Sequence, residues 1–218
     1  MSTFPNSPRL LKAGIVLLDP ESGAVRRIIT LQYNPDTLTR TLQPQGAGGE
    51  GGDRAEVLRL KGPPVETIKL EAEIDATDQL EFPEQHQLAT EAGISPQLAA
   101  LETILYPASS QLQSNNALAG AGTLEIIPTQ AALTVFVWSK NRVLPVRLTE
   151  FSITEEAFDP ALNPIRAKVS LGMRVLSVND VPFHHKAGGL YISYQRQKEQ
   201  LAARHQTGTF ASLGIEGV

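Results

Sequence analysis

Two histidines and a group of carboxylates are the side chains of this sequence with the strongest claim to reactivity. His184 and His185 are adjacent, and an imidazole beside a carboxylate is the usual general base of a hydrolytic enzyme. Neighbouring residues of an extended chain point to opposite faces, so these two imidazoles are poorly placed to share one metal ion. The polar linker around them favours a solvated pair.

Four acidic residues lie close together in the sequence at Glu150, Glu155, Glu156 and Asp159. Such a cluster could hold a cation or act as an acid–base pair. However, no glycine-bearing calcium loop of the EF-hand kind accompanies it, and the sequence has no G-x-S-x-G, HExxH or P-loop motif. We therefore expect charged strand ends and a turn, and we predict no catalytic residue, no cofactor and no metal site.

Two stretches are rich in small and polar residues. Gln43–Asp53 contains five glycines, and a phosphate cradle is one alternative for it, but the GK[ST] ending and a following amphipathic helix are missing. Such a segment buries too little apolar surface to offset its ordering entropy, so we expect a mobile loop near residues 43–55. Ala108–Gly122 is expected to be a second flexible loop.

The composition narrows the classes of function. Of the 218 residues, 41% are hydrophobic and 19% are charged, which is enough apolar material for a sizeable core. A net charge of −4 argues against a dedicated nucleic-acid binder. The absence of cysteine excludes disulfides and thiol catalysis and fits a reducing compartment. Met1–Arg9 lacks an apolar signal segment, so we expect cytoplasmic synthesis without a signal peptide and without membrane insertion.

Three strand-like runs form the centre of the predicted fold. Leu133–Trp138 is apolar almost throughout, which is typical of a strand covered on both faces, and a tight polar turn follows it. Val143–Glu155 changes the phase of its alternation near Thr149–Glu150, which indicates a β-bulge. Ile165–Val175 alternates regularly and predicts a long antiparallel strand with one buried and one wet face.

The flanking segments complete this expectation. Lys12–Leu18 and Val25–Tyr33 predict a hairpin, and Thr67–Asp75 predicts another half-buried strand. Ser95 followed by Pro96 predicts the start of a short amphipathic helix, with Ser95 as its cap. After a linker over Asn179–Gly189, a polar helix is expected over Leu190–Gln206. The predicted class is mainly β, an antiparallel sandwich or barrel with one short packed helix and a C-terminal helical tail.

Five segments of this pattern resemble a known family. They are Leu31–Pro35 (LQYNP), Leu98–Glu102 (LAALE), Val135–Val146 (VFVWSKNRVLPV), Leu148–Ile153 (LTEFSI) and Phe158–Pro160 (FDP). Together they resemble the tube-domain proteins of contractile injection systems, which are phage-tail-like particles. The likeness spans roughly Leu11–Asp180.

The resemblance implies a role and a set of partners. In that family the domain forms a hexameric ring in the baseplate, which joins the trimeric spike hub to the inner tube and templates tube assembly. The implied partners are the chain itself, the inner tube protein, the spike hub and other baseplate proteins. The tube-like β domain would then cover 1–180, and 181–218 would be a linker and helical tail in which no LysM module, common in the family, is recognised.

The residues that would face neighbouring subunits are only coarsely indicated. Aromatic residues are enriched at protein interfaces, so Tyr33, Trp138 and Phe158 are candidates together with the strand ends at Asn34 and Asp159. Two other functions stay open: a hydrolytic enzyme that pairs His184 or His185 with a carboxylate, and a stand-alone β module that binds a peptide or a glycan.

Overall fold

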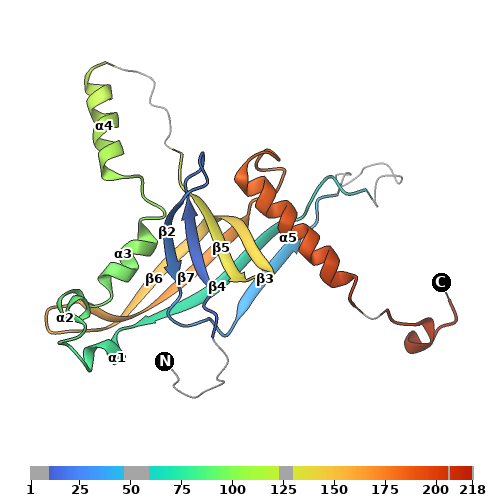
Figure 1. Ribbon diagram of the computed structural model, residues 1–218, viewed down its shortest axis with the longest axis horizontal. Coiled ribbons are helices and arrows are strands. Elements are labelled where there is room, and N and C mark those ends of the chain that lie inside the picture. The colour runs from blue at the N-terminus through green and yellow to red at the C-terminus, as the bar shows by residue number, and fades with distance from the viewer. Residues whose placement is uncertain (1–9, 47–58, 123–129, 206, 218) are drawn as a thin grey trace.

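The computed structural model describes residues 10–46, 59–122, 130–205 and 207–217. These residues form one seven-stranded antiparallel sheet in the order β2-β1-β5-β6-β7-β4-β3, accompanied by helices (Figure 1). The mainly β class is confirmed. The sheet is open, with β2 and β3 as its margins, rather than the closed barrel or the pair of packed sheets that the sequence predicts.

The strands are joined mainly by hairpins. Their bounds are β1 Gly14–Leu18, β2 Val25–Thr30, β3 Leu38–Gln43, β4 Val65–Asp75, β5 Leu133–Ser139, β6 Arg142–Phe158 and β7 Pro164–Val175. The predicted hairpin of the first two strands is confirmed, because β1 pairs antiparallel with β2. β6 and β7, with 17 and 12 residues, form the longest ladder in the sheet.

The two central sequence patterns predict the β6–β7 pair well. The register between these strands shifts between Leu148 and Glu150, which places a bulge at Thr149 as predicted. Along β7, alternate residues from Ala167 to Val175 are buried, whereas Arg166 is exposed. A bulge turns the following side chains back to the core face, so Phe151 and Ile153 pack against the core.

β5 is covered on both faces, as its apolar run predicts. Phe136 belongs to the main core, which lies inside the curved sheet together with Leu144 and Met173. Leu133 and Val135 point the other way and form a second, smaller cluster with Ala187 of the last long helix.

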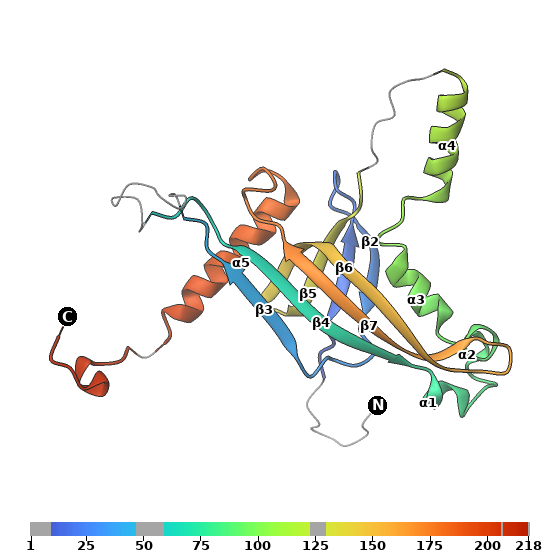
Figure 2. The same cartoon turned by 180° about the vertical axis from the view of Figure 1, so that it is seen from behind.

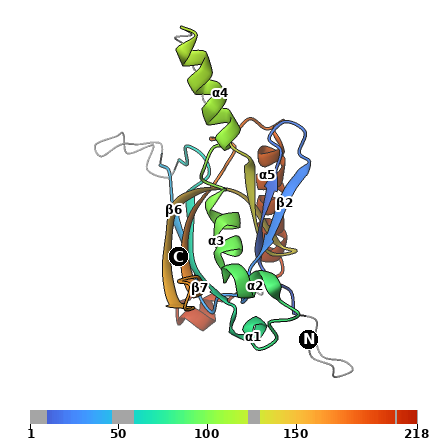
Figure 3. The same cartoon turned by 90° about the vertical axis from the view of Figure 1, so that its left-hand side faces the viewer.

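Helices occupy both ends of the sheet. Their bounds are α1 Thr77–Leu80, α2 Gln87–Ala92, α3 Ser95–Glu102, α4 Ser109–Gly120 and α5 Lys186–Ala202, with a short 3₁₀ turn at Phe210–Leu213. The first three gather at one end of the sheet and α5 lies across the other, as Figures 1 and 2 show. Figure 3 shows α4 standing away from the sheet.

The start of α3 differs in detail from the prediction. Pro96 lies in the first turn as expected, but Ser95 is already helical, and Ile94 occupies the cap position without a side-chain hydrogen bond. The chain is positioned there by Gly93, which has a φ of +57°, and by the hydrogen bond from Ile94 N to Pro164 O at 2.9 Å. Tertiary contact with β7 therefore takes the place of a capping side chain.

The prediction of a flexible loop over Ala108–Gly122 is wrong, because α4 occupies most of it. None of the residues of α4 is buried. Leu112, Ala117, Leu118 and Ala119 are good helix formers, and their propensity outweighs the Ser and Asn residues between them.

The C-terminal helix begins earlier than predicted. α5 starts at Lys186, because His185 caps it: the imidazole Nδ1 accepts a hydrogen bond from Ala187 N at 3.2 Å. Tyr191 and Tyr194 are buried in the main core, so α5 packs against the sheet, while Leu201 is exposed.

The glycine-rich segment falls largely outside the described residues. Of Gln43–Asp53, the structure describes only 43–46, where Gln43 ends β3 and Gly46 forms an isolated bridge with Leu60. β3 itself is a strand that the sequence patterns did not single out.

Candidate functional site

The two histidines have different surroundings. His184 is exposed, and His185 caps α5. His185 also lines an apolar cavity of about 490 Å³, and Arg147 is the one Asp, Glu, Lys or Arg residue among its described lining residues. Within the described part of the chain, neither imidazole is hydrogen-bonded to a carboxylate. The catalytic pairing that a hydrolytic enzyme would need is therefore not assembled at this cavity.

The acidic cluster is spread along one strand and a turn. Glu150 pairs with Lys69 at 2.7 Å, and Glu156 lies 3.9 Å from Lys168. Asp159 accepts hydrogen bonds from the backbone N–H groups of the turn that follows β6. In the residues that the structure describes, no three His, Asp or Glu side chains form a group that could hold a metal ion.

Hydrogen bonds hold both strand-end residues that the sequence marks as interface candidates. Asn34 accepts from Ala13 N at 2.9 Å and donates to Leu11 O at 2.8 Å, which ties the chain before β1 to the segment after β2. The Asp159 carboxylate accepts from the side chain and backbone of Asn163, and these bonds hold its pKa below the usual range. Both side chains have structural partners within their own chain.

The three aromatic candidates differ in exposure. Tyr33 is 46% exposed and Phe158 is 49% exposed, so both present apolar surface to solvent. Trp138 is half-buried, and its ring lies 6.1 Å from that of Phe136, measured between centroids. Trp138 thus extends the main core toward the surface.

The outer face of the β4–β7–β6 region is a broad polar surface. Ion pairs cross it between neighbouring strands: Lys69 with Glu150 at 2.7 Å and Arg166 with Asp75 at 2.8 Å. Burial alone would raise the pKa of Asp75, but hydrogen bonds from Thr77 and Arg166 lower it below the ordinary value. Charges of both signs therefore remain on this face, largely paired with each other.

Both margins of the sheet have an unpaired side. β2 bonds only to β1, and β3 bonds only to β4, among the described strands. The N–H and C=O of Asp75 in β4 both bond to Gln32 rather than to β7, so by alternation along β4 those of Thr67 also point toward β3. Thr41 lies opposite Thr67, so Thr41 bonds to β4 and the N–H and C=O of Leu42 point outward. Ile28 on β2 and Leu42 on β3 are 62% and 45% exposed, so each margin also offers apolar side chains.

The two margins approach each other at one end of the sheet. The Gln32 side chain donates to Asp75 O at 2.6 Å and accepts from Asp75 N at 2.9 Å, so its amide imitates a strand partner for β4. Because β3 begins opposite Leu70, the part of β4 from there to Asp75 has no strand beside it on the β3 side within the described chain. A gap is left between β2 and β4.

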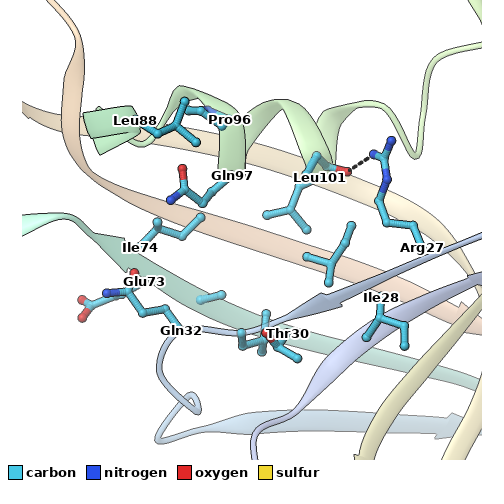
Figure 4. A pocket seen from close by; sticks show the side chains of 14 residues that line it. Arg27, Ile28, Thr30, Gln32, Glu73, Ile74, Leu88, Pro96, Gln97 and Leu101 are labelled. Atoms are coloured by element: carbon cyan, nitrogen blue, oxygen red, sulfur yellow. Dashed lines mark hydrogen bonds between the residues drawn. The ribbon is translucent and has the colours of Figure 1, made fainter. Parts of the chain in front are cut away.

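A pocket of about 370 Å³ fills this gap and is roofed by α3. We call it the margin pocket; its lining includes Ile28, Leu31, Ile74, Gln97 and Leu101 (Figure 4). Figure 4 shows the Gln97 amide reaching from α3 toward Ile74. The Oε1 atom of Gln97 is buried, and it accepts no hydrogen bond from any described residue. The walls of the margin pocket are mainly apolar, and its lining also includes the charged residues Arg27 and Glu73.

Arg27 fixes the roof of the margin pocket to β2. Its Nη1 donates to Ala100 O at 3.3 Å and to Thr103 Oγ1 at 2.8 Å. No carboxylate pairs with Arg27 in the described residues, so its charge is available at the rim.

A buried ionic network anchors α5 to the sheet. Glu66 is 3% exposed, and its Oε1 accepts from Arg40 at 2.9 Å and from Tyr194 OH at 3.1 Å. Lys198 Nζ lies 3.8 Å from Glu66 and 4.3 Å from the centroid of the Tyr194 ring. Desolvation by burial, with the nearby Glu66 charge, raises the pKa of Tyr194 to about 12.

This network predicts a loss of stability at alkaline pH. Folding raises the pKa of Tyr194 from near 10 to about 12. The protonated hydroxyl therefore makes its full contribution to the free energy of unfolding below pH 10, and this contribution is lost as the pH rises toward 12. The free energy of unfolding, measured with urea at several pH values, should fall over this window. In a Tyr194→Phe variant the fall should be shallower. An equal slope in the two proteins would contradict this role of Tyr194.

Comparisons with known proteins leave the family open: no protein-family model matches the chain, and no curated protein matches it either. No described helix is both long and apolar enough to cross a lipid bilayer. A function for this chain therefore has to be inferred from its own geometry.

Proposed function

We propose that the chain is a structural baseplate protein of a contractile injection system, which forms a hexameric ring between the spike hub and the inner tube. The observation that carries this proposal is the open sheet with an unpaired strand at each margin, β2 and β3. An exposed strand edge is a template for pairing with another chain. A contact between two different margins is heterologous, and repeated by rotation it closes into a ring.

The other surfaces of the sheet support the same function. The polar outer face of β4, β7 and β6 carries paired charges of both signs, which suits the water-filled wall of a tube. The β6–β7 hairpin, with strands of 17 and 12 residues, makes the sheet long in the direction of its strands. Neither feature requires a catalytic group, and the work proposed for the protein is mechanical.

A proline at the β3 margin tests the pairing of edges. Leu42→Pro removes an outward N–H and leaves the ladder with β4 intact, so the chain should fold. A lost intermolecular hydrogen bond costs about 1–3 kcal/mol, so the concentration needed for assembly should rise about tenfold or more. Size-exclusion chromatography with light scattering, run at several protein concentrations, measures the concentration at which the chain assembles.

The matched control is Leu42→Ala, which shortens the side chain and keeps the N–H. It should assemble at a concentration closer to that of the unchanged protein than the proline variant does. Electron microscopy of particles purified from the producing cells gives the wider test, because the tagged chain should be found at the baseplate. A chain missing from all such particles would refute the proposal.

A further inference from the structure

The apolar cavity beside His185 has the size and the lining of a small-molecule site. We call it the cap cavity, because His185 is the N-cap of α5. Its volume of about 490 Å³ lies within the range of ligand pockets in proteins. Most of its described lining residues are apolar, among them Ile104, Leu133, Leu148 and Val181. None of them belongs to β2 or β3, so the cap cavity is separate from both margins of the sheet.

Three polar side chains in this lining can donate a hydrogen bond and have no acceptor in the described chain. Thr134 is only 6% exposed, and a hydroxyl so deeply buried normally has a partner. The Nδ1 atom of His185 accepts from Ala187 N, so the neutral imidazole carries its hydrogen on Nε2, which has no partner among the described residues. Arg147 is exposed and forms neither a hydrogen bond nor an ion pair with a described side chain. An occupant that accepts hydrogen bonds would satisfy these donors.

The charges around the cap cavity favour an anion. The residue opposite Arg147 in the β6–β7 ladder is a second arginine, Arg174, and like charges in opposite positions destabilise a sheet. The carboxylate of Asp180 is already used, because it pairs with Arg174 at 2.7 Å and accepts from Ser177. α5 begins beside the cavity, and the N-terminus of a helix carries a partial positive charge. The described lining contains no Asp or Glu that could neutralise these charges.

We propose that the cap cavity binds a small molecule with an apolar body and one carboxylate group, such as a short fatty acid. The aliphatic side chains of the lining enclose the apolar body, and Arg147 and His185 donate to the carboxylate. A carboxylate is the partner that a guanidinium group binds with two parallel hydrogen bonds. The buried Thr134 hydroxyl supplies a further donor. This inference goes beyond the proposed function, because the ligand binds to a single copy of the chain, with or without an injection particle.

Titration of the full chain with octanoate, 1-octanol and octylammonium tests the class of ligand. The three probes share one apolar chain and differ in the charge of the head group. Hydrogen bonds to a charged group are stronger than those to a neutral one, so octanoate should bind at least about tenfold more tightly than octanol. Octylammonium should bind most weakly of the three, because its charge is repelled by Arg147. Isothermal titration calorimetry measures the three affinities.

NMR spectra with labelled Leu, Val and Ile methyl groups show where octanoate binds. The lining is rich in these residues, so saturable shifts should concentrate on Leu133, Leu148 and Val181. Three results on the unchanged chain would overturn the inference: no saturable binding of octanoate, equal affinities for octanoate and octanol, or shifts that concentrate outside the lining of the cap cavity.

Arg147→Gln isolates the contribution of the charge. Because Arg147 is exposed and has no partner in the described part of the chain, the variant should fold, which circular dichroism verifies. Its affinity for octanoate should fall about tenfold, whereas its affinity for octanol should not change. Arg204→Gln is the matched control, because Arg204 is also exposed and lies beyond the far end of α5. If Arg147→Gln bound octanoate as tightly as Arg204→Gln does, the inference would be wrong.

Thr134→Val removes the buried hydroxyl and keeps the shape of the side chain. Since the hydroxyl has no partner among the described residues, the variant should be as stable in urea as the unchanged protein. Its affinity for octanoate should nevertheless fall about threefold. A loss of stability with unchanged affinity would contradict the inference, because the hydroxyl would then serve the fold and not a ligand.

Light scattering distinguishes a small ligand from a second copy of the chain. Octanoate should bind without changing the mass of the assembly. If octanoate instead released copies from one another, a carboxylate of a neighbouring copy would be the occupant, and the inference would be overturned. The effect of Leu42→Pro would still decide the pairing of sheet margins, so failure of this inference is distinguishable from failure of the proposed function.

Discussion

Gly93→Ala is expected to lower the free energy of unfolding by about 3–5 kcal/mol, the sum of backbone strain and overpacking. Gly93 connects α2 to α3 with φ +57° and ψ −133°, a conformation that side chains rarely permit. A Cβ built there lies 2.1 Å from Pro164 O and 3.1 Å from Pro164 C, so rigid backbone would have to move. Urea denaturation followed by circular dichroism measures the loss.

The same substitution at Gly189 is the matched control. Gly189 lies in the first turns of α5, and a Cβ there meets nothing within 4 Å. Alanine is a better helix former than glycine, so Gly189→Ala should be neutral or stabilise the protein by up to about 1 kcal/mol. If both alanine variants lost the same stability, the explanation by backbone contact would be wrong.

Glu66→Ala is expected to cost about 3 kcal/mol, the lower end of the range for breaking a buried ion pair. The lower end applies because Arg40 and Lys198 keep 27% and 31% of their side-chain surface exposed, so water screens part of their charge. The substitution leaves two cations and the Tyr194 hydroxyl without their common acceptor. Hydrogen exchange should show the largest loss of protection in α5.

Glu71→Ala on the same strand is the control for this second prediction. Glu71 is exposed, whereas Glu66 faces the core, so its loss should change stability by less than about 0.5 kcal/mol. Equal effects at the two positions would contradict an anchoring role for Glu66.

The central strands could be predicted from sequence because their patterns are strong. Alternation over Ile165–Val175 defines a half-buried strand, and the change of phase near Thr149 locates the bulge. β3 was missed because Leu38 and Leu42 are its only apolar residues, with Arg40 between them on the same face, and most of its residues are exposed. An exposed margin strand lacks the buried face on which the alternation rule depends.

The features of the candidate sites depend on tertiary contacts, which explains why sequence alone did not find them. Gln32 lies in the LQYNP segment, but neither it nor Gln97 belongs to a catalytic or ligand-binding motif, and the two line the margin pocket only because the curled sheet brings β2 near β4. Glu66 directly precedes the predicted strand Thr67–Asp75 and shares the buried face of Ile68 and Leu70, but its partners Tyr194 and Lys198 come from α5, which lies far away in the sequence.

Native mass spectrometry of the full chain over a range of concentrations tests the central claim most directly. If copies of this chain join through their sheet margins, one closed assembly of six copies should accumulate at the expense of monomer as the concentration rises. A chain that remains monomeric at every concentration measured, or that forms open chains of no fixed length, would contradict the account.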